Sequence, residues 1–411
     1  MSEEKKHLET TQSADEVIDF SKITQRVKGF FDKSKAGHQT EVTEVKPHSQ
    51  HNSSKKDSED SLSIDINQVK NAAKKHAKWL IPLICILFAV IVSVYLRTMP
   101  QRMPIADDWA ENTIANYYQG LIKQQINQQY PFLPDQNKQS LIDKEWLNFQ
   151  VQNKANLAAQ TTTLSEQYRQ QFKDGEGTLY LLGIDPYHFY RQTQNVLENG
   201  FPGTGYFENG LVKDDLRIAP LGGASAWTFH NWFGAVWHRI MNLFGDFPLM
   251  YTFFFVGTIL SALTGIPGFF IGKKLTKNNV GGFFTAFMLA VTSFFVARTT
   301  GESSDTDVYA VFFPILITWL FLEALDAKDL KWRMVWISLA GFTTGLFAFA
   351  WTGWWYIALF LLATMIFQIG YILISQWKSI NVALKSKQVK ELFVLLGTYA
   401  IIVTLFVNIF T

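Results

Sequence analysis

The chain has 411 residues, of which 48% are hydrophobic, and it contains 35 Phe and 13 Trp. Its formal net charge of +2 gives no reason to expect a nucleic acid as partner. A single cysteine, Cys85, excludes a disulfide framework. The apolar residues form uninterrupted blocks close to the roughly 20 residues that a helix needs to cross a bilayer core. The composition therefore predicts an all-α polytopic membrane protein.

Residues 1–76 are polar and predict a disordered tail on the cytoplasmic side. Within them, five apolar residues share one helical face: Phe20, Ile23, Val27, Phe30 and Phe31. Two interpretations of this stretch stay open, an amphipathic helix on an anionic membrane surface and a weakly structured tail. No cleavable signal sequence is expected, because the first apolar block begins only near Trp79.

Seven apolar blocks predict about seven transmembrane helices. They lie at 79–96, 249–271, 280–297, 308–325, 334–350, 354–376 and 391–410. The first helix then occupies residues 77–97. Residues 98–247 form a long first external loop, and residues 248–411 contain helices two to seven.

One further segment, ASAWTFHNWFGAVWHRIMNLF at 224–244, decides the side of every later loop. Its apolar residues predict one helical stripe: Phe229, Trp232, Phe233, Val236, Ile240 and Phe244. Polar residues interrupt the other faces, among them His230, Asn231 and Arg239. With Trp and Arg in its middle, the segment favours an amphipathic helix lying in the membrane interface over a helix that crosses.

The distribution of basic residues agrees with a segment that does not cross. Lys and Arg then gather on the cytoplasmic side in four places, as the positive-inside rule requires: 74–78, 273–277, 328–333 and 378–390. The first external loop and a second loop at 298–308 lie together on the outer side. We expect a multi-pass protein of the plasma membrane with a cytoplasmic N terminus.

Two carboxylates, Asp305 and Asp307, stand between apolar blocks in VARTTGESSDTDVYAVFF at 296–313. Acids at this depth are costly unless they pair, face water or hold a cation. Two Asp separated by one residue in a non-helical turn can both point at one hard cation such as Mg²⁺ or Mn²⁺. A short, solvated acidic loop accounts for the same residues, so both interpretations remain.

A third acid occurs in LLGIDPYHFYR at 181–191, where Asp185 precedes Pro186. An Asp-Pro turn that opens a helix accounts for this pattern, with Asp185 as the N-cap. A capping carboxylate still has a second oxygen with which it can bind a metal ion.

Three motifs follow one another along the chain: GIDPY at 183–187 with Tyr190-Arg191 behind it, the helical segment from His230 to Phe244, and Arg298-Thr299 ahead of Asp305-Thr306-Asp307. In this order they resemble the amino-terminal membrane half of the oligosaccharyltransferase catalytic subunit, in its archaeal single-subunit form. The resemblance covers about 79–411, apart from an insertion at 105–180. It implies a glycosyltransferase C-type membrane fold.

The resemblance also implies the reaction. Enzymes of this family transfer a preassembled oligosaccharide from a polyprenyl (dolichyl) phosphate or pyrophosphate to Asn in Asn-X-Ser/Thr of an acceptor polypeptide. By matching position, Asp185 is the catalytic first-loop acid, near both the cation and the acceptor amide. Asp305 and Asp307 are the second-loop ligands of Mn²⁺ or Mg²⁺, which Asp185 also binds. Arg298 lies near the anionic donor.

Two parts of the family pattern are missing from the sequence. One is a later external loop with a glutamate, and the other is a carboxy-terminal domain with a Trp-Trp-Asp-type motif. The run Trp354-Trp355-Tyr356 lacks the Asp and lies among the apolar blocks. We therefore expect a fragment of a longer protein, or one half of a split gene, that is not catalytically competent alone.

Two other functions stay open. A membrane glycosyltransferase that uses a single sugar on a polyprenyl phosphate also places acids in the first external loop, but does not require the second Asp-x-Asp. A transporter would carry ionisable residues near the bilayer midplane, where these blocks are almost free of them.

Overall fold

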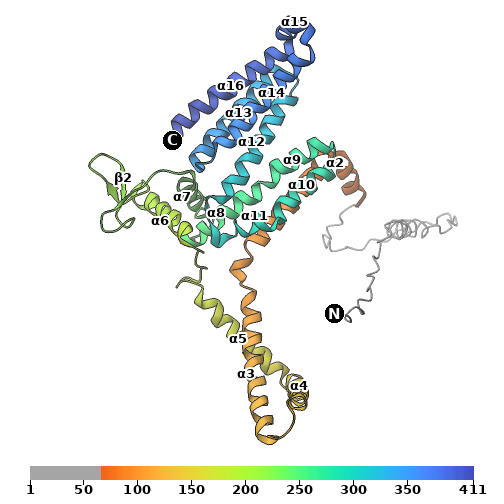
Figure 1. The fold of residues 1–411 in the computed structure, drawn as a ribbon, viewed down its shortest axis with the longest axis vertical. Helices are drawn as coiled ribbons and strands as arrows, with labels where there is room; N and C mark the ends of the chain where they lie inside the picture. The colour runs from red at the N-terminus through yellow and green to blue at the C-terminus, as the bar shows by residue number, and fades with distance from the viewer. Residues whose placement is uncertain (1–65) are drawn as a thin grey trace, which may run out of the picture. The chain divides into compact units, whose positions relative to one another are not determined.

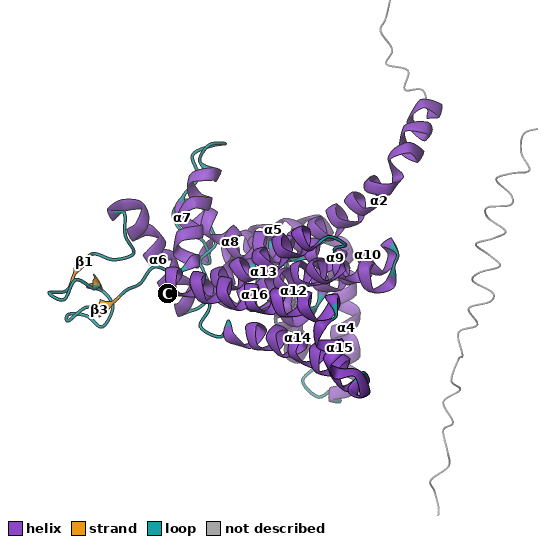
Figure 2. Ribbon diagram, turned by 90° about the horizontal axis from the view of Figure 1, so that it is seen from above, coloured by secondary structure: helices purple, strands orange, loops and turns teal. Residues whose placement is uncertain are grey.

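The computed structural model describes residues 66–411, with side chains from residue 78. The stretch at 20–31, for which an amphipathic helix is one prediction, lies outside the described residues. The described part is helical except for one small three-stranded sheet and the loops, as Figures 1 and 2 show. This confirms the all-α class.

Within residues 66–411, six helical stretches are long and apolar enough to cross a membrane. They are residues 78–97 of α2 (Ile66–Arg97), α8 (Leu249–Leu263) with α9 (Gly265–Thr276), the 3₁₀ turn η3 (Thr306–Val308) with α12 (Tyr309–Asp326), α13 (Leu330–Ala350), α14 (Trp355–Ser375) and α16 (Lys387–Phe410). They correspond to six of the seven predicted spans. The chain is a polytopic membrane protein.

The remaining predicted span, 280–297, is present as two shorter helices instead of one. These are α10 (Asn279–Val291) and α11 (Ser293–Ala297). The backbone leaves the helical region at Thr292, where φ is −56° and ψ is 115°. Helix α10 packs against α9 and α2, so this block still belongs to the membrane bundle.

The predicted first external loop folds into further elements. They are η1 (Met99–Arg102), α3 (Ile105–Gln129), α4 (Asp135–Gln152), α5 (Lys154–Gln171), α6 (Ile184–Asn199), β1 (Gly205–Tyr206), β2 (Val212–Asp214), β3 (Gly223–Ala224) and α7 (Phe229–Met241). Strand β2 pairs antiparallel with both β1 and β3. The other short elements are η2 (Gly301–Ser303), η4 (Trp377–Ser379) and α15 (Ile380–Lys385).

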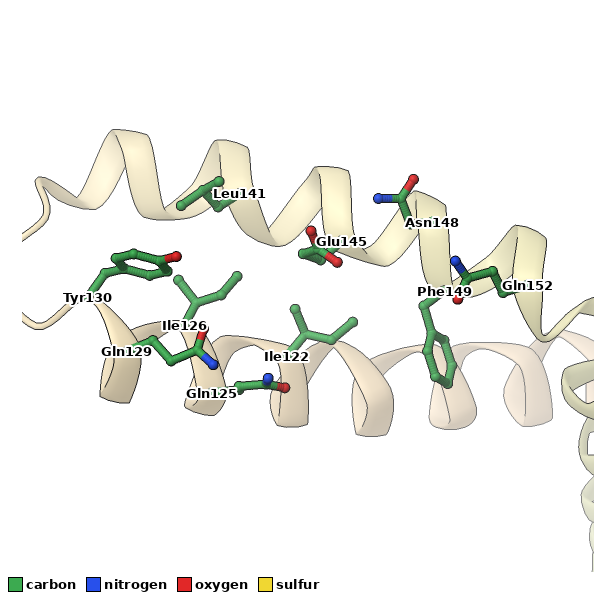
Figure 3. Close-up of a pocket in the computed structure, with 10 residues that line it drawn as sticks. All are labelled: Ile122, Gln125, Ile126, Gln129, Tyr130, Leu141, Glu145, Asn148, Phe149 and Gln152. Atoms are coloured by element: carbon green, nitrogen blue, oxygen red, sulfur yellow. The ribbon is translucent and has the colours of Figure 1, made fainter.

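Helices α3, α4 and α5 pack on one another and turn the predicted insertion at 105–180 into a helical arm, a name used below for residues 105–171. Arg169 of α5 binds the carboxylate of Asp107 of α3 at 2.6 Å. A cavity of about 440 Å³ separates α3 from α4. Figure 3 shows Tyr130 and Ile126 on one side of it and Leu141 and Glu145 on the other.

The main core lies where α7, α8, α12 and α13 meet. Its aromatic rings are fully buried, as in the pair of Phe313 on α12 and Phe347 on α13, whose centroids are 5.4 Å apart. Without a hydrophobic driving force between helices in lipid, such close packing holds the bundle together. This core runs along α12 from Tyr309, next to the loop at 298–308, to Ala324, and it continues onto α14 and α16.

Helix α7 adds two buried polar residues that the predicted amphipathic stripe did not include. The helix has 13 residues, too few to cross a membrane, which agrees with the predicted interfacial helix. Trp232 and Phe244 are exposed, whereas Phe229, His230 and Asn231 are buried against the protein. These two polar residues face inward because each finds a hydrogen-bond partner there: Asn231 donates to Gln192 of α6, and His230 bonds to Tyr309 of α12.

An ion pair between Arg333 of α13 and Glu391 of α16 joins these two helices near the turn from α12 into α13. The atoms Nη1 and Oε2 are 2.6 Å apart, and both side chains are about four-fifths buried. Arg333 also donates to the carbonyls of Leu325 and Ala327, which fixes the turn from α12 into α13. We expect Glu391→Gln to lower the free energy of unfolding by about 1–3 kcal/mol, because a partly buried guanidinium loses its counter-charge.

Thermal unfolding in detergent measures this loss. Lys387 offers the matched control, since its Nζ lies 3.8 Å from Glu391 but its side chain is 89% exposed. Lys387→Gln should leave the unfolding temperature almost unchanged. Equal effects of the two substitutions would contradict the role given to Arg333.

Candidate functional site

The loop at 298–308 joins α11 to α12 and contains Arg298, Asp305 and Asp307. It consists of two short 3₁₀ turns, η2 and η3, separated by extended backbone. Asp305 has φ −135° and ψ 179°, and its carboxylate accepts a hydrogen bond from the N–H of Thr306. Asp305 therefore caps η3, and the next turn leads directly into the buried start of α12.

The loop at 298–308 packs against two residues of helix α8, Phe253 and Phe254. The hydroxyl of Ser304 donates to the carbonyl of Phe253 at 2.9 Å. Gly301 lies so close to Phe254 that an added Cβ would be 1.9 Å from the ring. Glycine is needed here because of this close approach of the backbone. The loop is thus packed onto the bundle and does not stand free of it.

The segment with Asp185 lies at the N terminus of α6. Gly183 precedes the helix with φ 93° and ψ 173°, a conformation that is essentially restricted to glycine. Gly183 is thus the N-cap, and the prediction of Asp185 as the N-cap is wrong. Asp185 lies in the first turn, where the helix dipole favours a negative charge. Its side chain is exposed, so its carboxylate is free to meet a ligand from outside.

A backbone hydrogen bond joins the two predicted site segments. The N–H of Leu182 donates to the carbonyl of Glu302 at 2.7 Å. This bond places the start of α6 beside the loop at 298–308. This contact agrees with the expectation that the first external loop and the loop at 298–308 lie together.

The negative charges of the other two predicted acids act on Asp305. The pKa of Asp305 is raised from its ordinary value, mainly because burial removes water from the carboxylate, and further because of the negative charges of Asp307 and Asp185. Burial likewise raises the pKa of Glu302, and its Oε2 has no hydrogen-bond partner among the described residues. The site thus concentrates negative charge in a place where water is partly excluded.

Arg298 contacts one of these acids. Its Nη1 lies 3.4 Å from Oδ2 of Asp307, and the two side chains are 62% and 45% exposed. An ion pair this open contributes little to stability, because water screens both charges. It can therefore exchange for other partners.

The structure does not gather the three predicted metal ligands into one coordination shell. Within residues 78–411, no three His, Cys, Asp or Glu side chains lie close enough together to hold a metal ion. The carboxylate of Asp307 contacts Arg298, and the carboxylate of Asp305 accepts a hydrogen bond from the N–H of Thr306. The donor set, three carboxylates from two adjoining segments, still suits a hard divalent cation. The assignment of Asp185, Asp305 and Asp307 to one cation stays a prediction.

Two groups to which the sequence assigned no role, Arg97 and His230, hold the two ends of the loop. Arg97 at the end of α2 donates to the hydroxyl of Thr299. Nδ1 of His230 lies 2.7 Å from the hydroxyl of Tyr309, the first residue of α12. Burial lowers the pKa of His230 to about 3, so the imidazole is neutral.

One signal for Arg97 was present in the sequence. It lies at the predicted external end of the first span, where the positive-inside rule makes a basic residue unusual. For His230 no such signal existed, because a polar residue on an amphipathic helix normally faces water.

Comparisons with known proteins point to one family. Residues 155–411, more than half of the chain, match the family described as oligosaccharyl transferase STT3, N-terminal. The chain is 28% identical over 225 residues to a dolichyl-phosphooligosaccharide-protein glycotransferase from Methanococcus voltae, covering 53% of this chain and 24% of that protein. It is 29% identical over 189 residues to the protein of the same name from Methanocaldococcus jannaschii, covering 42% and 20%. The chain thus spans about a quarter of the length of these relatives.

Among solved structures, the chain is similar to the archaeal oligosaccharyltransferase from Archaeoglobus fulgidus in complex with an inhibitory peptide and a dolichol-phosphate. The identity is 21%, the TM-score is 0.41, and the match covers 56% of this chain and 30% of that one. An overlay of this quality says nothing about the side chains of the site.

The buried imidazole of His230 predicts a loss of stability in acid. Its pKa is lowered from 6.5 to about 3, so between these values the unfolded chain binds a proton that the folded chain does not. The stability is therefore present above about pH 6.5 and is lost as the pH falls, by about 2 kcal/mol at about pH 5. Thermal unfolding at the two pH values measures it, and His230→Gln should show a shallower dependence. An equal loss in both proteins would contradict the assignment.

The close contact of Gly301 gives a second prediction. Gly301→Ala places a methyl group against Phe254 and should destabilise the protein by about 1–3 kcal/mol, because the loop has to move. Gly397 on α16 is the matched control, since a Cβ there meets nothing within 4 Å. Gly397→Ala should be neutral or slightly stabilising in the same thermal unfolding measurement.

Proposed function

Because this chain belongs to the STT3 family of oligosaccharyl transferases, we propose that it carries the cation-binding and donor-binding part of an N-glycosylating enzyme. The enzyme transfers an oligosaccharide from a polyprenyl (dolichyl) phosphate or pyrophosphate to Asn in the Asn-X-Ser/Thr sequons of proteins. The names of the two archaeal relatives support a dolichyl-linked oligosaccharide as donor and a protein as acceptor.

The observation that carries this proposal is the bond from Leu182 to Glu302. It joins the segment of Asp185 to the loop of Asp305 and Asp307. A transferase that activates an amide beside a phosphate needs acids from separate segments at one point. A transporter has no need of such a cluster at the end of its spans, since its substrate site lies near the midplane.

In the proposed site, the carboxylates of Asp185, Asp305 and Asp307 bind one divalent cation, Mn²⁺ or Mg²⁺. When bound, the cation stabilises the negative charge that develops on the leaving phosphate. The chain itself supplies the negative charge that attracts the cation. Mutual repulsion of the acids, with Asp305 partly desolvated, makes a cation the natural partner of this cluster.

Two side chains act on the substrates. Asp185 orients and polarises the acceptor amide, which is a poor nucleophile by itself. Its position in the first turn of α6 holds the carboxylate at a fixed, exposed place. Arg298 binds the phosphate of the donor through its guanidinium. Its loose contact with Asp307 leaves both residues available for these roles.

The proposed reaction takes place at the outer face of the plasma membrane. The donor lipid lies in the same membrane as the chain, and the acids stand at the ends of α11 and α12, where its phosphate is expected. The N-terminal tail lies in the cytoplasm in this arrangement.

The chain spans about a quarter of the length of its relatives, so the test compares donors and variants in membranes from cells that produce it joined to the part of such a relative that it does not span. Wild-type membranes with Mn²⁺ should glycosylate an Asn-X-Thr peptide from lipid-linked oligosaccharide. Asp305→Asn and Asp185→Asn should each lower this transfer on the order of 100-fold, because the cation is held less tightly. Asp246→Asn removes an exposed acid outside the site and is the matched control.

Two outcomes would contradict the proposal. One is transfer of a single sugar from a polyprenyl phosphate in place of the oligosaccharide. The other is binding of Mn²⁺ to the purified chain, followed by electron paramagnetic resonance, that is the same in wild type and in Asp305→Asn.

A further inference from the structure

We propose that Arg97 is a positioning residue for the loop at 298–308. Its buried guanidinium fixes Thr299 and thereby holds the neighbouring Arg298 in place for the donor phosphate. The role given to Arg298 rests on the proposed function, whereas the fixing of the loop does not.

Arg97 is the last residue of α2 and is fully buried. Its Nε donates to Oγ1 of Thr299 at 2.8 Å. Its Nη1 donates to Oγ of Ser93 at 2.8 Å and to the carbonyl of Ala290 at 3.0 Å. One side chain therefore connects the end of the first span, the end of α10 and the first residues of the loop.

The carbonyl of Ala290 needs a partner because of the helix break. Helix α10 ends at Val291, so the carbonyls of its last turn lose their regular acceptor role within the helix. At the end of a membrane span such groups have to be satisfied by the protein. Arg97 supplies this bond, and the break at Thr292 and the buried arginine are two parts of one arrangement.

The hydroxyl of Thr299 is held from both sides. It accepts from Arg97 and donates to the carbonyl of Phe295. The guanidinium also lies over the ring of Phe295, 4.7 Å from its centroid. With both roles of the hydroxyl used, the position of Thr299 is fixed relative to α11 and α2.

No carboxylate among residues 78–411 lies within ion-pair distance of Arg97, so its charge has no direct counter-charge. A buried charge without a counter-charge is costly. The planar fork of arginine explains its use here, because it reaches three acceptors in fixed directions. Lysine, with a single nitrogen on a flexible stem, cannot serve all three at once.

Fixing Thr299 matters because Arg298 is its direct neighbour in the chain. Leu182 and Phe253 hold the loop at Glu302 and Ser304, which follow Arg298 by four and six residues. The contact from Arg97 lies one residue after Arg298, whose own N–H donates to the carbonyl of Phe294 in α11. Its loss should leave the acids in place while the guanidinium of Arg298 loses its fixed position.

The first arm of the test measures the loop directly. Amide hydrogen exchange of residues 298–304 is followed in the full chain in nanodiscs. Arg97→Gln, Arg97→Lys and Thr299→Val should all speed up this exchange, whereas Thr299→Ser, which keeps the hydroxyl, should not. Arg102→Gln is the matched control, because Arg102 is exposed and stacks on Tyr95 instead. Unchanged exchange in Arg97→Gln and Thr299→Val would overturn the proposal.

The second arm measures transfer in the same membranes as before. Arg97→Lys and Thr299→Val should each lower kcat/KM for the lipid-linked donor roughly tenfold, mainly through KM, because Arg298 is misplaced. The double substitution should be no worse than either single one, since both remove the same contact. Additive losses, or full rescue by Arg97→Lys, would overturn the positioning role.

The two arms also separate this proposal from the proposed function. Faster exchange in the variants, together with wild-type membranes that transfer no oligosaccharide, supports the fixing of the loop and contradicts the enzyme assignment. Should Arg97→Gln fail to insert or fold, Thr299→Val and Thr299→Ser test the same contact from its other end.

Discussion

Polar groups that are buried at the end of a helix have to find their hydrogen bonds within the protein, because no water reaches them. The loop at 298–308 satisfies this constraint with contacts to α2, α6 and α8. Arg97 holds its beginning, Leu182 its middle, and Ser304 bonds to Phe253 close to its end. Each of these contacts also decides where the acids and Arg298 lie. The hydrogen bonds that hold the loop therefore also bring the segment of Asp185 beside the loop of Asp305 and Asp307.

The end of this loop is continuous with the main core. Tyr309 directly follows η3 and is fully buried, and its hydroxyl bonds to the neutral His230 of α7. Helix α7 packs in turn on α6, which carries Asp185. A single run of packed elements thus leads from one predicted acid to the others. The interfacial helix acts as the support between the two segments.

The hydrophobic pattern of the sequence predicted most of the spans, because an apolar block of membrane length has few alternatives to a helix. The same pattern predicted one helix at 280–297 where the structure has α10 and α11, because the break at Thr292 depends on tertiary contacts and not on composition. Asp185, Asp305 and Asp307 stood out because charge is rare beside such blocks. Arg97 and His230 could not be assigned in this way, because their roles depend on partners far away in the chain. Only the fold shows that Thr299 and Tyr309 are those partners.

The helical arm of α3, α4 and α5 differs from the membrane bundle in how little apolar surface it buries. Within the described chain, α4 buries Ile142 and α5 buries Ser165, and a cavity lies between α3 and α4. Helix α3 adds four buried apolar residues, Ala106, Ala110, Ile114 and Ile126. So little buried apolar surface gives this arm a low free energy of opening, far below that of the membrane bundle. The arm should thus melt as a cooperative unit of its own at lower temperature. The protein then has two unfolding transitions, and its first one reports on the arm while the site is still intact.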